Sequence, residues 1–213
     1  MKQYEKIETV FCRDINGTKR LILNDYRNPT IAYLKDNVWL FTEKVDGTNI
    51  RVHWDGHKVE FSGRTDRAQI PGHLLNKLNE MFMTTEVEEL FEQTWGDKDV
   101  ILFGEGYGPK IQNGGEYRSD ASFILFDVLV GNNYQEREWV EKTAQMFNID
   151  VVPIVLTGTI QDGIDYVMKR PQSTMGTAMM EGVVGRPMVE LRDRRGGRVI
   201  VKIKWEDFKH FAT

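Results

Sequence analysis

The sequence predicts an α+β fold with mostly antiparallel sheets. Short apolar runs of strand length outnumber the segments with helical periodicity. Turn signals such as Asn16-Gly17 and Asp55-Gly56 separate these runs, and the strands do not alternate with helices as βαβ units would require. Because no internal repeat and no long polar linker interrupts the chain, we expect a single domain over residues 1–213.

The composition is that of a globular chain, with 40% hydrophobic and 28% charged residues. The net charge of -4 excludes a surface that is basic all over, so a nucleic-acid contact would need a local patch. The segment 192–204 contains six basic residues and only one acidic residue, Asp193. By pattern alone, a solvated hairpin with charged flanks explains this segment equally well.

Cys12 is the only cysteine, which excludes an internal disulfide and a cysteine-based metal site. A reducing compartment is then expected, which means the cytoplasm, or the host cytoplasm if the protein is encoded by a phage. No signal peptide and no run of 18 apolar residues is found, so we expect no membrane insertion.

Lys44 lies between two predicted strands. Residues 38–41 form a buried apolar run, and residues 50, 52 and 54 alternate as in a strand with one buried face. Asp46-Gly47 marks the turn between them, because glycine reaches positive φ without steric cost. A lysine at such a strand end can be partly desolvated, as a nucleophilic amine requires. The pattern by itself is also compatible with a solvated lysine on the surface.

Apolar residues at spacings of three and four predict two helices within residues 73–95, with Thr84 at the N-terminus of the second. Further helices are predicted over 136–147, with Trp139 and Val140 facing inward, and over 160–169. Further strands are predicted over 100–103, 123–130, 151–156 and 198–204. In the last strand Lys202 and Lys204 alternate with apolar residues and share one face.

The polar candidates lie at the ends or on one face of apolar strands. They are Lys44, Arg64, Glu105, Glu181, Lys202 and Lys204. The glycines around Glu105 do not form a dinucleotide fingerprint, since Pro109 prevents the helix that would receive a pyrophosphate. A cleft with a nucleophilic lysine, several cations and two carboxylates suits phosphoryl chemistry on a nucleotide.

Residues 44–49 (KVDGTN) resemble the first motif of the covalent nucleotidyltransferases, the superfamily of polynucleotide ligases and capping enzymes. Asn49 gives this motif the form found in phage-type ATP-dependent RNA ligases. Five further segments resemble the later motifs of these ligases in the same order, namely 62–65 (SGRT), 103–106 (FGEG), 123–128 (FILFDV), 181–184 (EGVV) and 201–204 (VKIK). Six motifs in order are far more specific than any single one.

The resemblance implies an α+β ligase-type nucleotidyltransferase domain (ATP-grasp-like), in which two antiparallel sheets are flanked by helices and ATP binds between them. It also implies a three-step reaction. Lys44 attacks the α-phosphate of ATP to form a lysyl-AMP, the AMP passes to a 5′-phosphate end of RNA, and a 3′-hydroxyl end then displaces AMP. Magnesium is the expected metal, with manganese as a substitute.

The resemblance also assigns roles to single residues. Lys44, Lys202, Lys204 and Glu181 are the implied catalytic residues, with Lys202 and Lys204 on the α-phosphate. Arg64 and Glu105 are expected near the ribose, and Glu181 with Asn49 near the metal. Glu43 and Phe126 are expected to bind adenine, with Phe123 as a core aromatic on the same strand.

Three rival functions remain open. A DNA nick-sealing ligase would use the same domain, as would a GTP-dependent capping enzyme, and a nucleotide- or RNA-binding module could have lost catalysis. The presence of Lys44, Glu181, Lys202 and Lys204 argues against the last. We expect a monomer acting on RNA ends, with nicked duplexes as one form of substrate.

Many relatives carry a further C-terminal domain that binds nucleic acid. After Phe208 only five residues follow, so we expect no OB-type or other accessory domain. A minimal ligase, a separate partner protein and a longer natural chain would each account for this.

Overall fold

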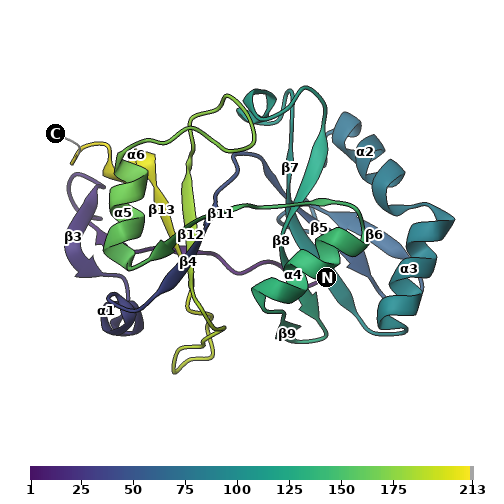
Figure 1. Cartoon of the computed structure of the whole chain (residues 1–213), viewed down its shortest axis with the longest axis horizontal. Helices are drawn as coiled ribbons and strands as arrows, with labels where there is room; N and C mark the ends of the chain where they lie inside the picture. Colours follow the sequence, from purple (N-terminus) through teal and green to yellow (C-terminus); the bar gives the residue numbers. More distant parts are fainter. Residues whose placement is uncertain (212–213) are drawn as a thin grey trace. The chain divides into compact units, whose positions relative to one another are not determined.

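The computed structural model describes residues 1–211. The described chain forms two compact units, and the fold is α+β as predicted (Figure 1). Unit 1 comprises Met1–Glu5 and Asp46–Val152, and unit 2 comprises Lys6–Val45 and the segment from Pro153 onward. Each unit has its own sheet and its own apolar core. The single domain over 1–213 stays a prediction.

Unit 1 is built on a six-stranded sheet of order β10-β8-β7-β5-β6, with β9 paired to β8. Only the β10–β8 pair is parallel. The strands are β5 (Thr48–Trp54), β6 (Val59–Ser62), β7 (Val100–Tyr107), β8 (Ser122–Val130), β9 (Asn133–Tyr134) and β10 (Asp150–Val151). The helices are α2 (Gly72–Phe82), α3 (Thr85–Trp95), the 3-10 helix η1 (Gly114–Glu116) and α4 (Arg137–Met146).

The two helices predicted within 73–95 are confirmed as α2 and α3. Helix α3 begins after Thr84, whose side chain accepts a hydrogen bond from the Val87 N–H and so satisfies one free donor of the first turn. The inward orientation predicted for Trp139 is wrong, because this side chain is 54% exposed. Val140, as predicted, and Ala144 form the buried stripe of α4, and Lys142 lies over the Trp139 ring.

Unit 2 is built on a five-stranded sheet of order β1-β13-β12-β4-β11, beside a two-stranded β2-β3 sheet. Only the β1–β13 pair is parallel. The strands are β1 (Glu8–Thr9), β2 (Phe11–Arg13), β3 (Leu21–Tyr26), β4 (Trp39–Glu43), β11 (Ile154–Gly158), β12 (Gly182–Pro187) and β13 (Val201–Lys204). The helices are α1 (Pro29–Leu34), α5 (Ile160–Met168) and α6 (Trp205–Phe208).

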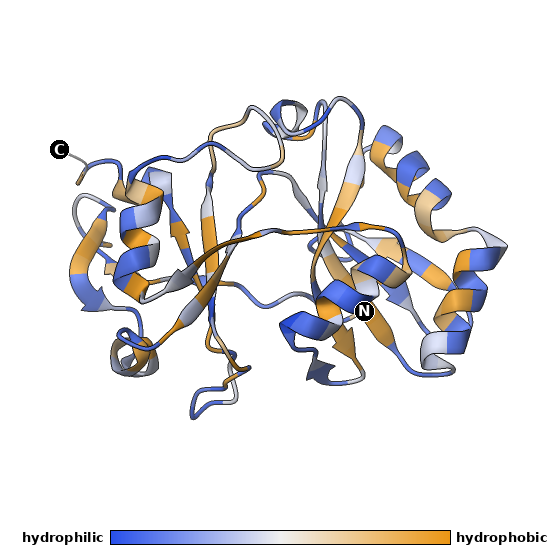
Figure 2. Ribbon diagram, viewed as in Figure 1, coloured by the Kyte–Doolittle hydropathy of each residue, from blue (hydrophilic) through white to orange (hydrophobic). Residues whose placement is uncertain are grey.

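Strand β13 has the two faces that its sequence predicts. Val201 and Ile203 are buried in the core of unit 2, whereas Lys202 and Lys204 lie half-buried on the other face. Figure 2 shows apolar residues on the strands of both units, where the two cores lie. The strand is shorter than the predicted 198–204, because residues 198–200 belong to a hairpin in which Arg198 pairs with Arg192.

Within residues 1–211, no helix combines the length and the apolar character that a membrane span requires.

Candidate active site

Lys44 follows the last residue of β4, and its backbone is fixed by the neighbouring strand. The Lys44 N–H donates to the carbonyl oxygen of Gly182 at 2.9 Å, so the β4–β12 pairing continues one residue beyond β4. Its side chain is 28% exposed. Lys44 is therefore a half-buried lysine at a strand end, as the sequence indicates.

Glu181 bridges two of the predicted lysines. Its Oε2 atom lies 2.5 Å from Lys44 Nζ, and its Oε1 atom lies 2.7 Å from Lys204 Nζ. The register explains this arrangement, because Gly182 pairs with Lys204 and brings the preceding carboxylate to the end of β13. The 18% exposure of Glu181 reduces solvent screening, so both ion pairs are stronger than surface pairs.

Lys202 is the third cation of this cluster. Burial is the largest cause that lowers the pKa of Lys202, followed by the charges of Lys44 and Lys204. Lys6 lowers this pKa further, and Asp207 opposes the effect. A partly buried group of like charges is unfavourable by itself and favours the binding of an anion such as a phosphate.

Glu43 is the last residue of β4 and is 1% exposed. Its Oε2 atom accepts hydrogen bonds of 3.4 Å from the Thr174 N–H and the Thr174 hydroxyl. Burial raises the pKa of Glu43, while hydrogen bonds from Ser173 and Thr174 oppose this rise. Glu43 therefore lies next to the nucleophile, in a setting that favours its protonated form.

The turn between Lys44 and β5 needs glycine for a reason that differs from the expected one. Gly47 does not adopt a positive φ. A Cβ atom at this position would lie 2.3 Å from the Gly106 carbonyl oxygen and 2.9 Å from Glu105 Cγ. Close approach of the turn to β7 therefore excludes any side chain here.

In unit 1, Asn49 on β5 pairs directly with Glu105 on β7. Cross-strand partners share one face of a sheet, so the two side chains are neighbours. The Asn49 Oδ1 atom is buried and has no hydrogen-bond partner within the described part of the chain. Two of the predicted site residues thus meet on the face opposite the Ile50 and Val52 core.

Phe126 and Phe123 lie on opposite faces of β8. Phe123 is completely buried in the core of unit 1, whereas Phe126 is half-buried. Phe103 pairs with Asp127 and Gly104 with Leu125, so Phe126 is the extra residue of a β-bulge. Bulges redirect side chains and are frequent beside active sites. The core role expected for Phe123 is thereby confirmed.

Tyr4 packs against the edge of the Phe126 ring, with 5.0 Å between the ring centroids. Its hydroxyl donates to Asp127 Oδ2 at 2.7 Å, and its ring also lies 4.9 Å from that of Phe103. The N-terminal segment Met1–Glu5 therefore covers the sheet face that carries Phe126. This contact could not be predicted from the sequence, because nothing near Tyr4 indicates a partner 123 residues away.

Arg64 lies after β6 with an exposed side chain, and within residues 1–211 its guanidinium group makes no hydrogen bond or ion pair. Its backbone is held by Arg51, which is completely buried on β5. Arg51 Nε donates to the Gly63 carbonyl at 2.8 Å, and Arg51 Nη2 donates to Asp66 Oδ1 at 2.8 Å. The role of Arg51 could not be predicted from the sequence, because an arginine between Ile50 and Val52 fits the polar face of a strand that alternates polar and apolar residues.

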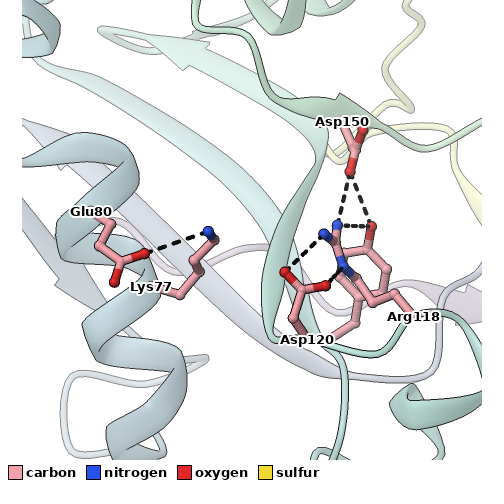
Figure 3. Close-up of polar contacts among 6 residues, drawn as sticks. Lys77, Glu80, Arg118, Asp120 and Asp150 are labelled. Carbon is pink, nitrogen blue, oxygen red and sulfur yellow. Dashed lines mark hydrogen bonds and ion pairs between the residues drawn. The ribbon is translucent and has the colours of Figure 1, made fainter.

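The loop that follows β7 fixes the turn at Asp46. Asn113 donates to Asp46 Oδ2 at 2.7 Å, and the Asp46 N–H donates to the Tyr117 hydroxyl at 3.4 Å. Figure 3 shows how Arg118 anchors this loop between the carboxylates of Asp120 and Asp150. These bonds hold the loop next to the start of β5.

Each of the two predicted metal ligands offers an oxygen donor. Glu181 offers a carboxylate in unit 2, and Asn49 offers its unpartnered buried oxygen in unit 1. Both are hard oxygen donors of the kind that Mg²⁺ and Mn²⁺ bind. Residues 1–211 contain no group of three His, Cys, Asp or Glu side chains placed to hold a metal. Waters and phosphate oxygens would therefore supply most of the ligands.

The structure thus brings Lys44, Glu181, Lys202 and Lys204 together in unit 2. Glu43, next to Lys44 in the chain, pairs with Val183 of β12 and contacts Thr174. The structure places Asn49, Glu105, Arg64 and Phe126 in unit 1. The common cleft expected for the polar candidates Lys44, Arg64, Glu105, Glu181, Lys202 and Lys204 stays a prediction.

Comparison with solved structures shows the same fold. A Naegleria gruberi RNA ligase mutant without ligand matches 99% of this chain and 57% of its own, at 17% identity and a TM-score of 0.69. Another mutant of that ligase, with ATP and Mn, matches 97% of this chain and 57% of its own, at 19% identity and a TM-score of 0.67. The chain thus spans little more than half the length of these structures.

No curated protein matches the sequence. The family model described as RNA ligase matches residues 37–204, which include every motif from the Lys44 turn to the end of β13. This match covers most of the chain and, together with the lysine and glutamate cluster at the ends of β4 and β13, shows that the chain belongs to the RNA ligase family.

Proposed function

We propose that this chain is an ATP-dependent RNA ligase that joins 5′-phosphate and 3′-hydroxyl ends through a covalent lysyl-AMP on Lys44. The observation that carries the proposal is the Glu181 carboxylate, which bridges Lys44 and Lys204 beside the half-buried Lys202. This cluster places a nucleophilic amine among cations that attract a phosphate. Family membership makes ATP and RNA the expected substrates.

In the first step Lys44 Nζ, as the neutral amine, attacks the α-phosphorus of ATP. A nitrogen–phosphorus bond forms, the bond to the bridging oxygen breaks, and pyrophosphate leaves with the electron pair. Glu181 Oε2 lies 2.5 Å from Nζ and accepts the hydrogen bond along which the proton of the ammonium group departs. Lys202 and Lys204 stabilise the negative charge on the phosphate oxygens.

In the second step an oxygen of the RNA 5′-phosphate attacks the same phosphorus, and the Lys44 nitrogen leaves and regains a proton. The RNA now carries a 5′-to-5′ linked AMP. In the third step the 3′-hydroxyl attacks the 5′-phosphate, loses its proton and expels AMP. The acceptor of that proton must be a base near the 3′ end.

The remaining residues bind and orient the nucleotide in this proposal. Arg64 and Glu105 contact the ribose, and Phe126 stacks on adenine. Glu43, kept protonated by burial, donates a hydrogen bond to a ring nitrogen of adenine.

A divalent metal ion, when bound, neutralises charge on the phosphates, with Glu181 and Asn49 as its protein donors. Similar structures of the Naegleria gruberi RNA ligase with ATP and Mn, and with AMP and Mn, support ATP with Mg²⁺ or Mn²⁺. We further propose that the protein acts as a monomer in the cytoplasm and that nicked duplexes are among its substrates.

The covalent step is tested with ATP labelled at the α-phosphate. We expect label on the denatured protein in the presence of Mg²⁺, none on Lys44→Ala, and undiminished label on Lys58→Ala, in which an exposed lysine is removed. No label from ATP in any variant would contradict the proposal and favour a binding module without catalysis. Label from GTP alone would favour a capping enzyme.

The substrate is tested on two duplexes that differ only at the nick. One has an RNA 3′-hydroxyl strand and the other an all-DNA strand. If the nick with the RNA strand is sealed at least about tenfold faster than the all-DNA nick, the result supports an RNA ligase. A tenfold difference corresponds to about 1.4 kcal/mol in the activation barrier. Faster sealing of the all-DNA nick would instead identify a DNA ligase.

A further inference from the structure

The segment between β12 and β13, residues 188–200, forms a hairpin that the proposed chemistry does not use. Arg192 pairs with Arg198 across its stem, and the Val199 N–H donates to Leu191 O at 2.9 Å. In Figure 1 the hairpin is the loop that extends beyond β4 and β12 on the side away from α6. We call it the arginine hairpin.

The arginine hairpin is internally braced. At its tip the Asp193 Oδ1 atom accepts hydrogen bonds from the Arg195 N–H at 2.8 Å and the Gly197 N–H at 2.9 Å. At its base the Arg198 guanidinium, 2% exposed, pairs with both carboxylate oxygens of Glu190. The two acidic residues of the hairpin are therefore used to hold its shape.

This bracing leaves Arg194 and Arg195 exposed at the tip. Within residues 1–211 neither guanidinium group makes a hydrogen bond or an ion pair, whereas those of Arg192 and Arg198 in the same hairpin both have partners. The hairpin has four arginines against two acidic residues, although the whole chain has a net charge of -4. A braced loop with two unpaired guanidinium groups is suited to bind phosphates.

The arginine hairpin lies at the far end of β12 from the nucleophile. Gly182, at the start of β12, accepts the hydrogen bond from Lys44, and Pro187, at its end, pairs with Trp39. Five residues of strand at about 3.3 Å each give a separation of at least about 17 Å. Each strand of a duplex has one phosphate for about every 3.4 Å of helix axis. Measured along this axis, the hairpin therefore lies about five or more phosphates from the reacting α-phosphate.

We propose that Arg194 and Arg195 bind the phosphate backbone of the RNA substrate, five or more phosphates away from the end that is joined. This inference rests on the proposed function for the identity of the nucleic acid. It explains how a chain with an acidic net charge holds RNA through a local basic feature. It also predicts that the hairpin acts only on substrates long enough to reach it.

The test compares the wild type with Arg194→Gln/Arg195→Gln in binding to a nicked RNA duplex with about twelve base pairs on each side of the nick. We expect affinity at least about tenfold lower at about 0.1 M salt, and a salt dependence whose slope is smaller by about 1.4 to 1.8. A duplex with about three base pairs on each side should bind both proteins equally. Equal affinity and equal slope on the long duplex would overturn the proposal.

Two control variants separate charge from position. Arg194→Lys/Arg195→Lys keeps both charges and should retain most of the affinity. Lys58→Ala/Lys142→Ala removes two exposed charges in unit 1 and should leave binding of the long duplex unchanged. If removal of these two unit 1 lysines weakens binding equally, the effect comes from net charge and the proposal is wrong.

An assay of lysyl-AMP formation shows whether Arg194 and Arg195 bind the phosphates of RNA or those of ATP. The glutamine double variant should form lysyl-AMP with an unchanged KM for ATP. A raised KM would assign the two arginines to the triphosphate and overturn the RNA assignment. Absence of lysyl-AMP in the wild type would refute the proposed function. The comparison of RNA binding needs no ATP, so it would still test the role of the arginine hairpin.

Discussion

Arg51 Nη2 donates to Asp66 Oδ1 across 2.8 Å, and the two side chains differ sharply in exposure. The Arg51 side chain is completely buried, whereas that of Asp66 is 60% exposed. The hydrogen bond from Arg51 lowers the pKa of Asp66. Arg51 also donates to the carbonyl oxygens of Gly63, Met1 and Lys2. One buried guanidinium thus ties β5 to the N-terminal segment and to the residues on both sides of Arg64.

We expect Arg51→Met to destabilise the protein by about 3–5 kcal/mol, because it leaves three carbonyl oxygens without their donor. Urea unfolding measures the change. Arg51→Lys should be intermediate, since an ammonium group cannot reproduce the guanidinium fork.

Asp66→Asn is the matched control for this prediction. It removes the charge of the exposed partner alone, and the amide oxygen of the introduced asparagine can still accept the hydrogen bond, so the loss should be much smaller than for Arg51→Met. Similar losses for the two variants would mean that the ion pair, and not the bonds to the carbonyl oxygens, stabilises this region.

Gly47→Ala tests the close approach of the Asp46 turn to β7. The added methyl group would lie 2.3 Å from the Gly106 carbonyl oxygen. We expect a loss of about 1–3 kcal/mol, since overpacking forces the backbone to shift, and slower formation of lysyl-AMP as the turn after Lys44 moves. Thermal unfolding and the labelling assay measure the two effects.

Gly72→Ala provides the comparison for Gly47→Ala, because Gly72 begins α2 and has no atom within 4 Å of an added Cβ. This variant should be neutral or more stable by up to about 1 kcal/mol. A neutral Gly47→Ala would show that the turn can move away from β7 without cost.

The elements with strong periodicity were predictable from the sequence. Helices α2 and α3 follow from their apolar spacing and from Thr84, and the two faces of β13 follow from the alternation around Lys202. Lys44 could be found because a turn signal and an apolar strand flank it. The roles of the site residues stay predictions, although the ion pairs of Glu181 place it beside two of the expected lysines.

Features that depend on distant pairing could not be predicted. The bulge at Phe126 is decided by the register between β7 and β8, which the sequence of β8 alone does not contain. The contact of Tyr4 with Asp127 and the burial of Arg51 need the N-terminal segment to cross the sheet of unit 1. The length of β13 was overestimated because apolar residues 199 and 200 extend its pattern into the arginine hairpin.

Glu43 gives a prediction for the pH dependence of stability. Burial raises the pKa of this carboxyl above its ordinary value of 4.5. At a pH between 4.5 and the raised value, the native state holds a proton that the unfolded chain releases. The stabilisation from this proton is complete below 4.5 and is lost as the pH rises through the pKa of the native state.

Glu43→Gln should remove this pH dependence, because the amide imitates the protonated carboxyl and does not titrate. The free energy of unfolding of the variant, measured in urea from about pH 4 to pH 8, should therefore rise relative to the wild type across the interval above 4.5 and then run parallel to it. Glu89→Gln, on an exposed position of α3, should follow the wild type throughout. Parallel curves for Glu43→Gln and the wild type would mean that Glu43 is ionised in the folded protein over this range, and would exclude it as a hydrogen-bond donor to adenine.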